Sequence, residues 1–197
     1  LFEPEPEIAF LDLVTCGEIL SNCFEFSDEE VFDEDIKKIF GHIQKLEDSD
    51  TISNIIKSRL FQVKRRYVLT LLGLLNDYFF TNTESKEGFG ILKKEDIEQC
   101  IKATYDLRSK YVHTGIRFGW AIKLIPYHNE VQIGKPVTGN DELDKILAKC
   151  PTIIGFERII RFCLLRFIHL FGFKFDGRLD GPGLNGVSLR ANFRVPN

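Results

Sequence analysis

The most informative segment of the chain is Tyr105-Asp106-Leu107-Arg108-Ser109-Lys110-Tyr111-Val112-His113-Thr114-Gly115. It closes a stretch in which Glu95 and Asp96 favour the first turn of a helix and apolar residues recur at steps of three and four. A glycine directly after a helix is a common stop, and a histidine in the last turn is typical of helix C-termini. The sequence therefore predicts a helix that begins near Glu95, points its apolar residues inward, Val112 included, and ends at Gly115.

Arg108 and His113 form an R-x4-H pair within this helix. Histidine exchanges a proton near neutral pH, and arginine is a permanently charged fork that matches phosphate geometry. RNA cleavage by side chains needs a base for the 2′-hydroxyl, an acid for the leaving oxygen and a cation for the phosphorane charge. The pair suits such a site, but the string alone favours a structural interpretation, in which the histidine complements the helix dipole and the arginine is solvated or ion-paired.

The spacing of the pair bears on how such a site is assembled. Five residues at about 100° each place Arg108 and His113 about 140° apart around an ideal helix, so the two do not share a face. Ser109 and His113 do share one, because they are four residues apart. Two copies of the helix facing each other would bring Arg108 to His113, which favours a symmetric dimer with a shared cleft.

The whole segment resembles the Tyr-x-x-Arg-Ser-x-x-x-His-x-Gly signature of Apea-like domains in the HEPN superfamily. The segment Gly17-Glu18-Ile19-Leu20 looks like that family's first helix with its glutamate, and a strongly apolar helix closes the domain. The resemblance covers roughly residues 8–173. It implies an all-α, HEPN-type helical bundle of about five to six helices. Such domains are commonly homodimers that act as metal-independent endoribonucleases in toxin–antitoxin and antiphage-defence systems.

Carried over by matching position, the resemblance makes His113 the general acid and base, Arg108 the phosphate-binding residue and Ser109 the residue that orients them. The implied substrate is RNA, the products are a 2′,3′-cyclic phosphate and a 5′-hydroxyl, and neither a cofactor nor a metal ion is expected. Gly115 stands where some HEPN toxins carry a tyrosine that a partner nucleotidyltransferase modifies, which argues against that kind of antitoxin. Two alternatives remain open: a non-catalytic module that binds nucleotide or RNA, and a dimerisation scaffold.

Upstream of the motif the pattern is helical as well. Residues 8–24 have apolar positions at helical spacing, and Ser27 opens a capping-box sequence. Residues 33–35 would also suit the first turn of a helix, and the apolar stripe of that helix extends to Leu46. From residue 52 to residue 78 the apolar period is unbroken, which predicts one long helix with a continuous buried face.

Downstream of the motif the helical period is lost over residues 116–139, which predicts an insertion that is irregular or β-hairpin-like. A short helix is expected from Asn140 to Ala148, and a very apolar one after Pro151. Residues 1–175 are expected to form one domain. Residues 176–197 contain four glycines and two prolines and are expected to be an irregular tail.

The net charge of −3 hides an asymmetry along the chain. Residues 1–50 hold 15 acidic and 3 basic residues, whereas the remainder holds 14 acidic and 23 basic ones. Such a split indicates an anionic partner for the second part, although two solvated faces that attract each other explain it equally well. The residues proposed to contact RNA are Lys64, Arg65, Arg66, Lys110 and Arg117. Arg158, Arg161 and Arg166 of the last helix are weaker candidates, because they form no single stripe.

The cysteines and the apolar segments bound the compartment and the partners. The five cysteines include no CxxC pair, which points to reduced thiols in the cytoplasm and to no metal site. The most apolar segment, residues 153–173, carries Glu157 and several basic residues, so it predicts a helix buried in protein and no membrane span. A chain that starts at Leu1 without any methionine is expected to be cut from a longer protein, whose other domains, or an antitoxin, would be further partners.

Overall fold

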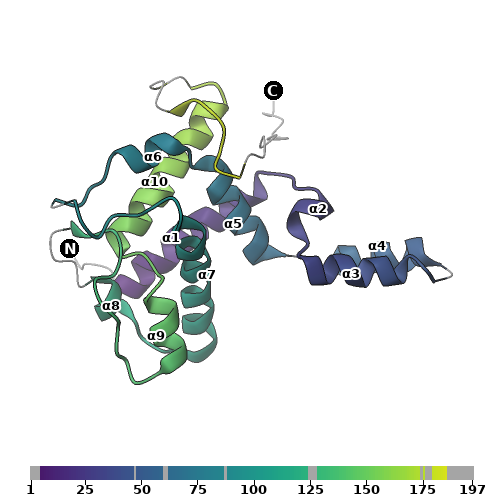
Figure 1. Ribbon diagram of the computed structural model, residues 1–197, viewed down its shortest axis with the longest axis horizontal. Helices are drawn as coiled ribbons and strands as arrows, with labels where there is room; N and C mark the ends of the chain where they lie inside the picture. Colours follow the sequence, from purple (N-terminus) through teal and green to yellow (C-terminus); the bar gives the residue numbers. More distant parts are fainter. Residues whose placement is uncertain are drawn as a thin grey trace.

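The computed structural model describes residues 5–46, 48–59, 62–86, 88–123, 128–173, 175 and 179–185. In these ranges the chain forms ten helical segments and no strand (Figure 1). The prediction of an all-α fold is therefore confirmed. The helices are more numerous than the five to six expected, because several connections contain a helical turn or two of their own.

Four helices form the centre of the molecule, and they pack across one another in Figure 1. They are α1 (Pro6–Asn22), α5 (Val63–Leu74), α7 (Ile97–Thr114) and α10 (Ile153–Leu170). Helix α1 contacts the other three, and α5 contacts both α7 and α10. The fully buried side chains between them include Phe10, Tyr67, Leu71, Ile101 and Phe156. This arrangement buries most of α5, whose residues from Tyr67 to Leu74 are all buried.

Helix α7 begins and ends where the sequence predicts. Asp96 is its N-cap, and Gly115 ends it in the left-handed conformation with φ of 68°. The Gly115 N–H donates to the Tyr111 carbonyl at 2.7 Å, as expected for a helix that stops at glycine. The prediction that Val112 points inward is wrong, because 54% of this residue is exposed. It lies one turn after the half-buried Arg108, on a face of α7 outside the core.

The single long helix predicted from residue 52 to residue 78 is instead divided. The structure has α4 (Ser49–Arg59), α5 and α6 (Asp77–Thr81). Leu75 leaves the helix with a ψ of 145°, and the Asn76 side chain accepts a hydrogen bond from the Phe79 N–H at 3.3 Å to start α6. Leu74, Leu75 and Phe79 are all buried, so the apolar period continues across the break and does not reveal it.

The segment before α4 also forms two helices where one apolar stripe was predicted. The capping box at Ser27 is present, but it starts only the single turn of α2 (Asp28–Val31). The Asp33 side chain then accepts from the Ile36 N–H at 2.9 Å and starts α3 (Glu34–Ile43). Helices α3 and α4 form a hairpin that projects from the bundle (Figure 1). A second apolar cluster lies at the base of this hairpin: Val31, Phe32, Phe40, Ile43 and Leu69.

The insertion after the motif helix is helical and irregular. It contains α8 (Gly119–Lys123), and α9 (Asp141–Leu147) follows it and packs on α7. The only β-type contact in the described part of the chain is an isolated bridge between Val131 and Pro151, so the β-hairpin-like form is wrong there. Asn140 caps α9 as predicted, accepting from two backbone N–H groups of its first turn.

A buried ion pair fixes the insertion to the bundle. The Glu130 carboxylate is fully buried and accepts from Arg158 Nη1 at 2.9 Å, from the Leu92 N–H at 2.9 Å and from the Glu84 N–H at 2.7 Å. Arg158 also donates to the carbonyl groups of Phe79 and Asn82. Arg158 is therefore a structural residue inside the protein and does not line an RNA cleft.

Part of the expected tail is packed against the bundle. The Leu184 N–H donates to the carbonyls of Leu72 and Leu75 at 3.1 and 3.0 Å. His169 Nε2 lies 2.8 Å from Asp180 Oδ1, and the buried Arg166 side chain donates to the Gly181 carbonyl. Residues 179–185 thus cover α5 and α10 without regular structure, and residues 186–197 lie outside the described ranges. Within the described part of the chain, no helix combines the length and the hydropathy that a membrane span needs.

Candidate functional site

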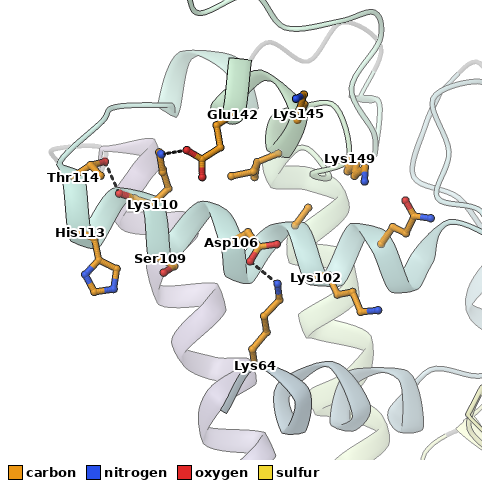
Figure 2. Close-up of a pocket in the computed structure, with 13 residues that line it drawn as sticks. Lys64, Lys102, Asp106, Ser109, Lys110, His113, Thr114, Glu142, Lys145 and Lys149 are labelled. Atoms are coloured by element: carbon orange, nitrogen blue, oxygen red, sulfur yellow. Dashed lines mark hydrogen bonds and ion pairs between the residues drawn. The ribbon is translucent and has the colours of Figure 1, made fainter. Parts of the chain in front are cut away.

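The outer face of α7 and the neighbouring α9 enclose a cavity of about 830 Å³, shown in Figure 2. We call it the lysine groove. Its α7 side is a stripe at steps of three and four that includes Lys102, Asp106, Lys110 and His113, and Lys64 reaches it from α5. Its other side is formed by α9 and by Lys149, which lies just after the end of α9. Ser109 and His113 line the groove together with its charged residues, which are Lys64, Lys102, Asp106, Lys110, Glu142, Lys145 and Lys149.

The charges of the lysine groove are only partly compensated. Lys64 Nζ lies 2.5 Å from Asp106 Oδ1, and Lys110 forms an ion pair with Glu142 across the groove. Lys102 pairs with Glu98 at 2.7 Å, just outside. Among the described residues, neither Lys145 nor Lys149 has an ion-pair partner. Five lysines against two carboxylates make the groove attractive to a polyanion, since lysines that neutralise phosphates release the cations condensed on a nucleic acid.

His113 and Ser109 both line this groove. His113 lies in the last turn of α7 and is exposed, and its ring has no hydrogen bond or ion pair with the described residues. Figure 2 shows both side chains on the lower edge of α7, on the side toward Lys64. An imidazole with this exposure is accessible to a substrate in the groove.

Arg108 occupies a different environment, between α7 and α1. Its Nη2 lies 3.7 Å from Glu18 Oε1, and its guanidinium carbon is 5.8 Å from the centre of the Tyr105 ring. Burial raises the pKa of the Tyr105 phenol, and the Glu18 carboxylate raises it further. The glutamate singled out in the first helix therefore meets the arginine of the motif. Because this guanidinium is half-buried and oriented by two neighbours, it is held in a defined place at the surface.

The structure does not bring Arg108 and His113 together within one copy of the chain. His113 lines the lysine groove, and Arg108 does not. This separation agrees with the angle of about 140° between them on an ideal helix. A site that uses both residues consequently needs either a substrate that spans the two faces of α7 or a second copy of the chain.

The five residues proposed to contact RNA are divided between two places. Lys64 and Lys110 line the lysine groove. Arg65 lies 3.9 Å from Glu98, and Arg66 donates to the Phe24 carbonyl at 3.1 Å. Arg117 lies elsewhere, with its guanidinium 2.8 Å from Glu5 and 3.3 Å from Glu7. None of these three arginines lines the groove.

Sequence reasoning missed three lysines of the groove, namely Lys102, Lys145 and Lys149. A local signal existed for two of them, because Lys145 lies in the helix predicted from Asn140 to Ala148 and Lys149 directly follows that helix. Their place in the groove that His113 also lines had no local signal, since it depends on how α9 packs against α7. Among the described residues, no group of three or more histidine, cysteine, aspartate or glutamate side chains is arranged to hold a metal ion.

Comparisons with family models, with curated proteins and with solved structures found no match to this chain. The case for a function thus depends on the motif, the fold and the geometry of the lysine groove.

Proposed function

We propose that this chain is a HEPN-type endoribonuclease that works as a homodimer. In the proposed reaction the 2′-hydroxyl of a nucleotide attacks the adjacent phosphorus, and the bond from phosphorus to the 5′-oxygen breaks. His113 takes the proton of the 2′-hydroxyl as a general base and then gives it to the leaving 5′-oxygen as a general acid. Arg108 compensates the charge that develops on the phosphorane, and Ser109 orients the reacting groups. The products are a 2′,3′-cyclic phosphate and a 5′-hydroxyl, and the chemistry requires no metal ion.

One observation carries this proposal: the only histidine of the motif is exposed on a groove lined by five lysines. A solvated helix-terminal histidine has no need of such a setting, whereas a residue that exchanges protons beside a phosphodiester does. The contact between Arg108 and Glu18 adds support, because an ion pair of this kind fixes the direction of a guanidinium at the surface.

The homodimer is part of the proposal because of the angle between the two residues. Each catalytic pair would combine Arg108 of one protomer with His113 of the other, and the two-fold symmetry would produce two such pairs in one cleft. A role as a toxin or antiphage-defence effector follows from the sequence resemblance alone and is proposed on that ground.

The test compares the wild type with Arg108→Ala and His113→Ala on total RNA in the presence of EDTA, using denaturing gels. We expect cleavage by the wild type and a loss of at least about 100-fold in each variant, the range typical of acid–base residues. A matched control is His42→Ala, because His42 is also an exposed histidine in the last turn of a helix, α3. Cleavage that survives His113→Ala, or a folded wild type that cuts no RNA, would contradict the proposal.

A second candidate is a non-catalytic module that binds RNA or nucleotide phosphate. The observation in its favour is that Arg108 and His113 lie on different faces of α7, while the excess of lysines in the groove would suit a polyanion without any chemistry. The same variants separate the two functions. For a binding module, the wild type would shift labelled RNA without cutting it, and His113→Ala would only weaken the binding.

A further inference from the structure

The lysine groove continues into two more cavities. A second cavity, of about 640 Å³, shares Gln99 and Lys149 with the groove, and a third, of about 430 Å³, shares Val131 and Gln132 with the second. We call the third one the Trp120 pocket. The α7 stripe from Gln99 to His113 alone spans about 21 Å, which matches about six nucleotides at a stacked spacing of about 3.4 Å. A single path thus leads from His113 along α7 into the segment that follows α8.

The Trp120 pocket is apolar and open to solvent. Three large apolar residues line it while remaining well exposed: Trp120 at 52%, Ile133 at 57% and Val137 at 81%. Lys135 also lines it. Exposed apolar residues scattered singly are ordinary, but several gathered around one hollow next to a basic groove indicate a surface that binds something.

A buried amide in the same pocket has no hydrogen-bond partner among the described residues. Asn129 lines the Trp120 pocket and is only 1% exposed, yet within the described part of the chain neither its side-chain nitrogen nor its side-chain oxygen has a hydrogen bond. Buried side-chain amides are nearly always hydrogen-bonded, so an exception calls for an explanation. The Asn129 side chain is packed closely against Gly90, where an added Cβ would come within 2.8 Å of Asn129 Cγ. Its place is therefore fixed in the wall of the pocket, with both amide atoms covered. A ligand able to both donate and accept would satisfy the amide after a shift of the side chains that cover it.

We propose that the Trp120 pocket binds one nucleobase of a single-stranded RNA whose phosphates follow the lysine groove. The indole offers a stacking surface, and Ile133 and Val137 offer apolar walls. The Asn129 amide lies covered in the wall and offers a donor and an acceptor to a base edge once the side chains that cover it shift. A paired base has its face and its edge occupied, so duplex RNA would not enter. The inference rests on the proposed function, because it assigns this base to the substrate that His113 cuts.

Trp120 is the only tryptophan of the chain, so its fluorescence reports directly on the pocket. The probe is a ten-nucleotide 2′-O-methyl RNA, which cannot be cut because it lacks the attacking hydroxyl. We expect saturable quenching by the single strand and none by the same sequence in a duplex. Equal responses to both forms, or no response to either, would overturn the base pocket.

Variants then connect the quenching with affinity. Trp120→Ala should weaken binding of a fluorescein-labelled probe by about tenfold in fluorescence polarisation, the usual loss of one stacked base. Phe173→Ala is the matched control, since Phe173 is a 68% exposed aromatic residue beyond the end of α10 and outside the three cavities. Asn129→Ala should also weaken binding, but Trp120→Ala decides because its side chain lies at the surface. Equal affinities of Trp120→Ala and Phe173→Ala would overturn the proposal.

The continuity of the path has its own test. Combining Lys145→Gln with Lys149→Gln should weaken binding of the RNA probe. It should also lower the dependence of the affinity on salt concentration, because fewer counterions are released from the RNA on binding. Lys37→Gln with Lys38→Gln is the matched control, since these two lysines lie on α3 and pair with Glu34 and Asp35. An unchanged salt dependence in the groove variant would overturn the proposed path.

Failure of the nuclease and failure of the pocket give different results. If the wild type cuts RNA and Trp120→Ala binds and cuts as well as the wild type, the pocket is wrong and the nuclease stands. If the single strand quenches Trp120 and no RNA is cut, the nuclease is wrong and the protein is a module that binds single strands through this pocket.

Discussion

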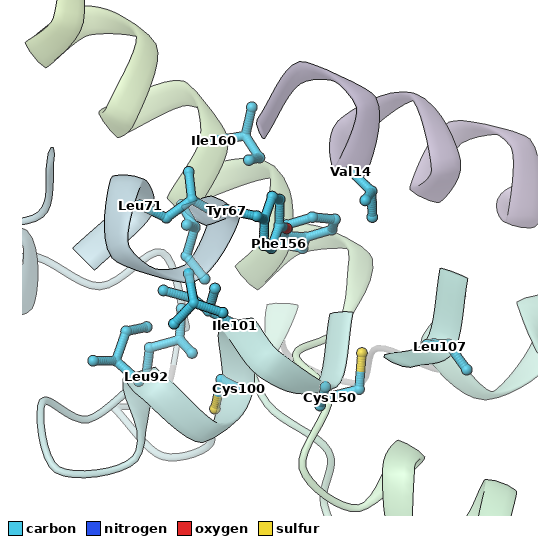
Figure 3. Packing of buried hydrophobic residues seen from close by; sticks show 14 of the residues in the cluster. Val14, Tyr67, Leu71, Leu92, Cys100, Ile101, Leu107, Cys150, Phe156 and Ile160 are labelled. Atoms are coloured by element: carbon cyan, nitrogen blue, oxygen red, sulfur yellow. The ribbon is translucent and has the colours of Figure 1, made fainter. Parts of the chain in front are cut away.

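The contact between Gly17 and Tyr67 determines how closely α1 approaches α5. Tyr67 is fully buried in the cluster that Figure 3 shows with Val14 and Phe156, and its hydroxyl lies 2.8 Å from the Thr104 hydroxyl. Its ring lies directly against Gly17. One tyrosine thus joins three central helices, and the absence of a side chain at residue 17 makes room for it.

Gly17→Ala should lower the free energy of unfolding by about 1–3 kcal/mol, the usual cost of overpacking a core. The new Cβ would lie 2.4 Å from Tyr67 Cε2, and the buried ring cannot move away freely. Urea denaturation measures the change. Gly41→Ala is the control, because nothing lies within 4 Å of a Cβ there and the helix α3 is exposed. Gly41→Ala should raise the free energy of unfolding by about 0.5–1 kcal/mol. An equal loss of stability in both variants would contradict overpacking against Tyr67 as the cause.

Glu7 is a buried carboxylate at the junction of α1 and α8. Burial raises its pKa, but hydrogen bonds from the Gly119 N–H at 2.9 Å and from Arg117 Nε at 3.3 Å outweigh this and hold the pKa below the ordinary value of 4.5. A lowered pKa in the folded state means that the charged carboxylate stabilises the fold above the ordinary pKa. This contribution is lost as the pH falls through the lowered one.

Glu7→Gln should therefore lower the free energy of unfolding at pH 7 by about 1–2 kcal/mol, the difference between a charged and a neutral acceptor. The gap between wild type and variant should narrow as the pH falls below 4.5. Urea denaturation at a series of pH values checks both statements. Glu5→Gln serves as the control, because Glu5 is exposed and its pair with Arg117 contributes less than about 1 kcal/mol. A gap that stays constant with pH would contradict the role given to the Glu7 charge.

Among the elements, the connection between the insertion and the bundle depends on the Glu130–Arg158 pair. The pair joins the loop before α7, the insertion and α10, and both charges are buried. Replacing one member leaves the other charged, buried and without its partner. This lowers the free energy of unfolding far more than replacing both members does. The pair also holds the residues around Asn129, and thereby the wall of the Trp120 pocket.

Arg158→Met should destabilise the protein by about 3–5 kcal/mol, and adding Glu130→Gln should recover part of this loss. Thermal unfolding of the two single variants and the double variant supplies the coupling energy. Arg161→Met, on the solvent side of the same helix, removes exposed pairs with Glu157 and Glu84 and should cost less than about 1 kcal/mol for each. Strictly additive losses in the double variant would show that the two charges do not depend on each other.

For the whole molecule, the decisive question is whether two copies share the site. Mixing Arg108→Ala protein with His113→Ala protein should restore activity if each catalytic pair uses one residue from each protomer. At random exchange of equal amounts, about half of the dimers would be mixed, and each mixed dimer would hold one intact pair where the wild type holds two. About a quarter of the wild-type activity is therefore expected. Cleavage assays after denaturation and refolding of the mixture measure this. Native mass spectrometry shows whether mixed dimers have formed. If they have and no cleavage activity is recovered, a site shared between two protomers is contradicted.

The sequence by itself determined the helical class, the start and end of α7, the cap at Asn140 and the R-x4-H motif, because helical period, caps and glycine stops act over a few residues. It did not reveal the break at Leu75, since the residues on both sides of it are buried and the period continues. Only the tertiary structure decided that α9 brings Lys145 and Lys149 to the groove that His113 also lines, and that Arg108 meets Glu18 away from that groove. These contacts join segments far apart in the chain, and the packing of whole helix faces fixes them.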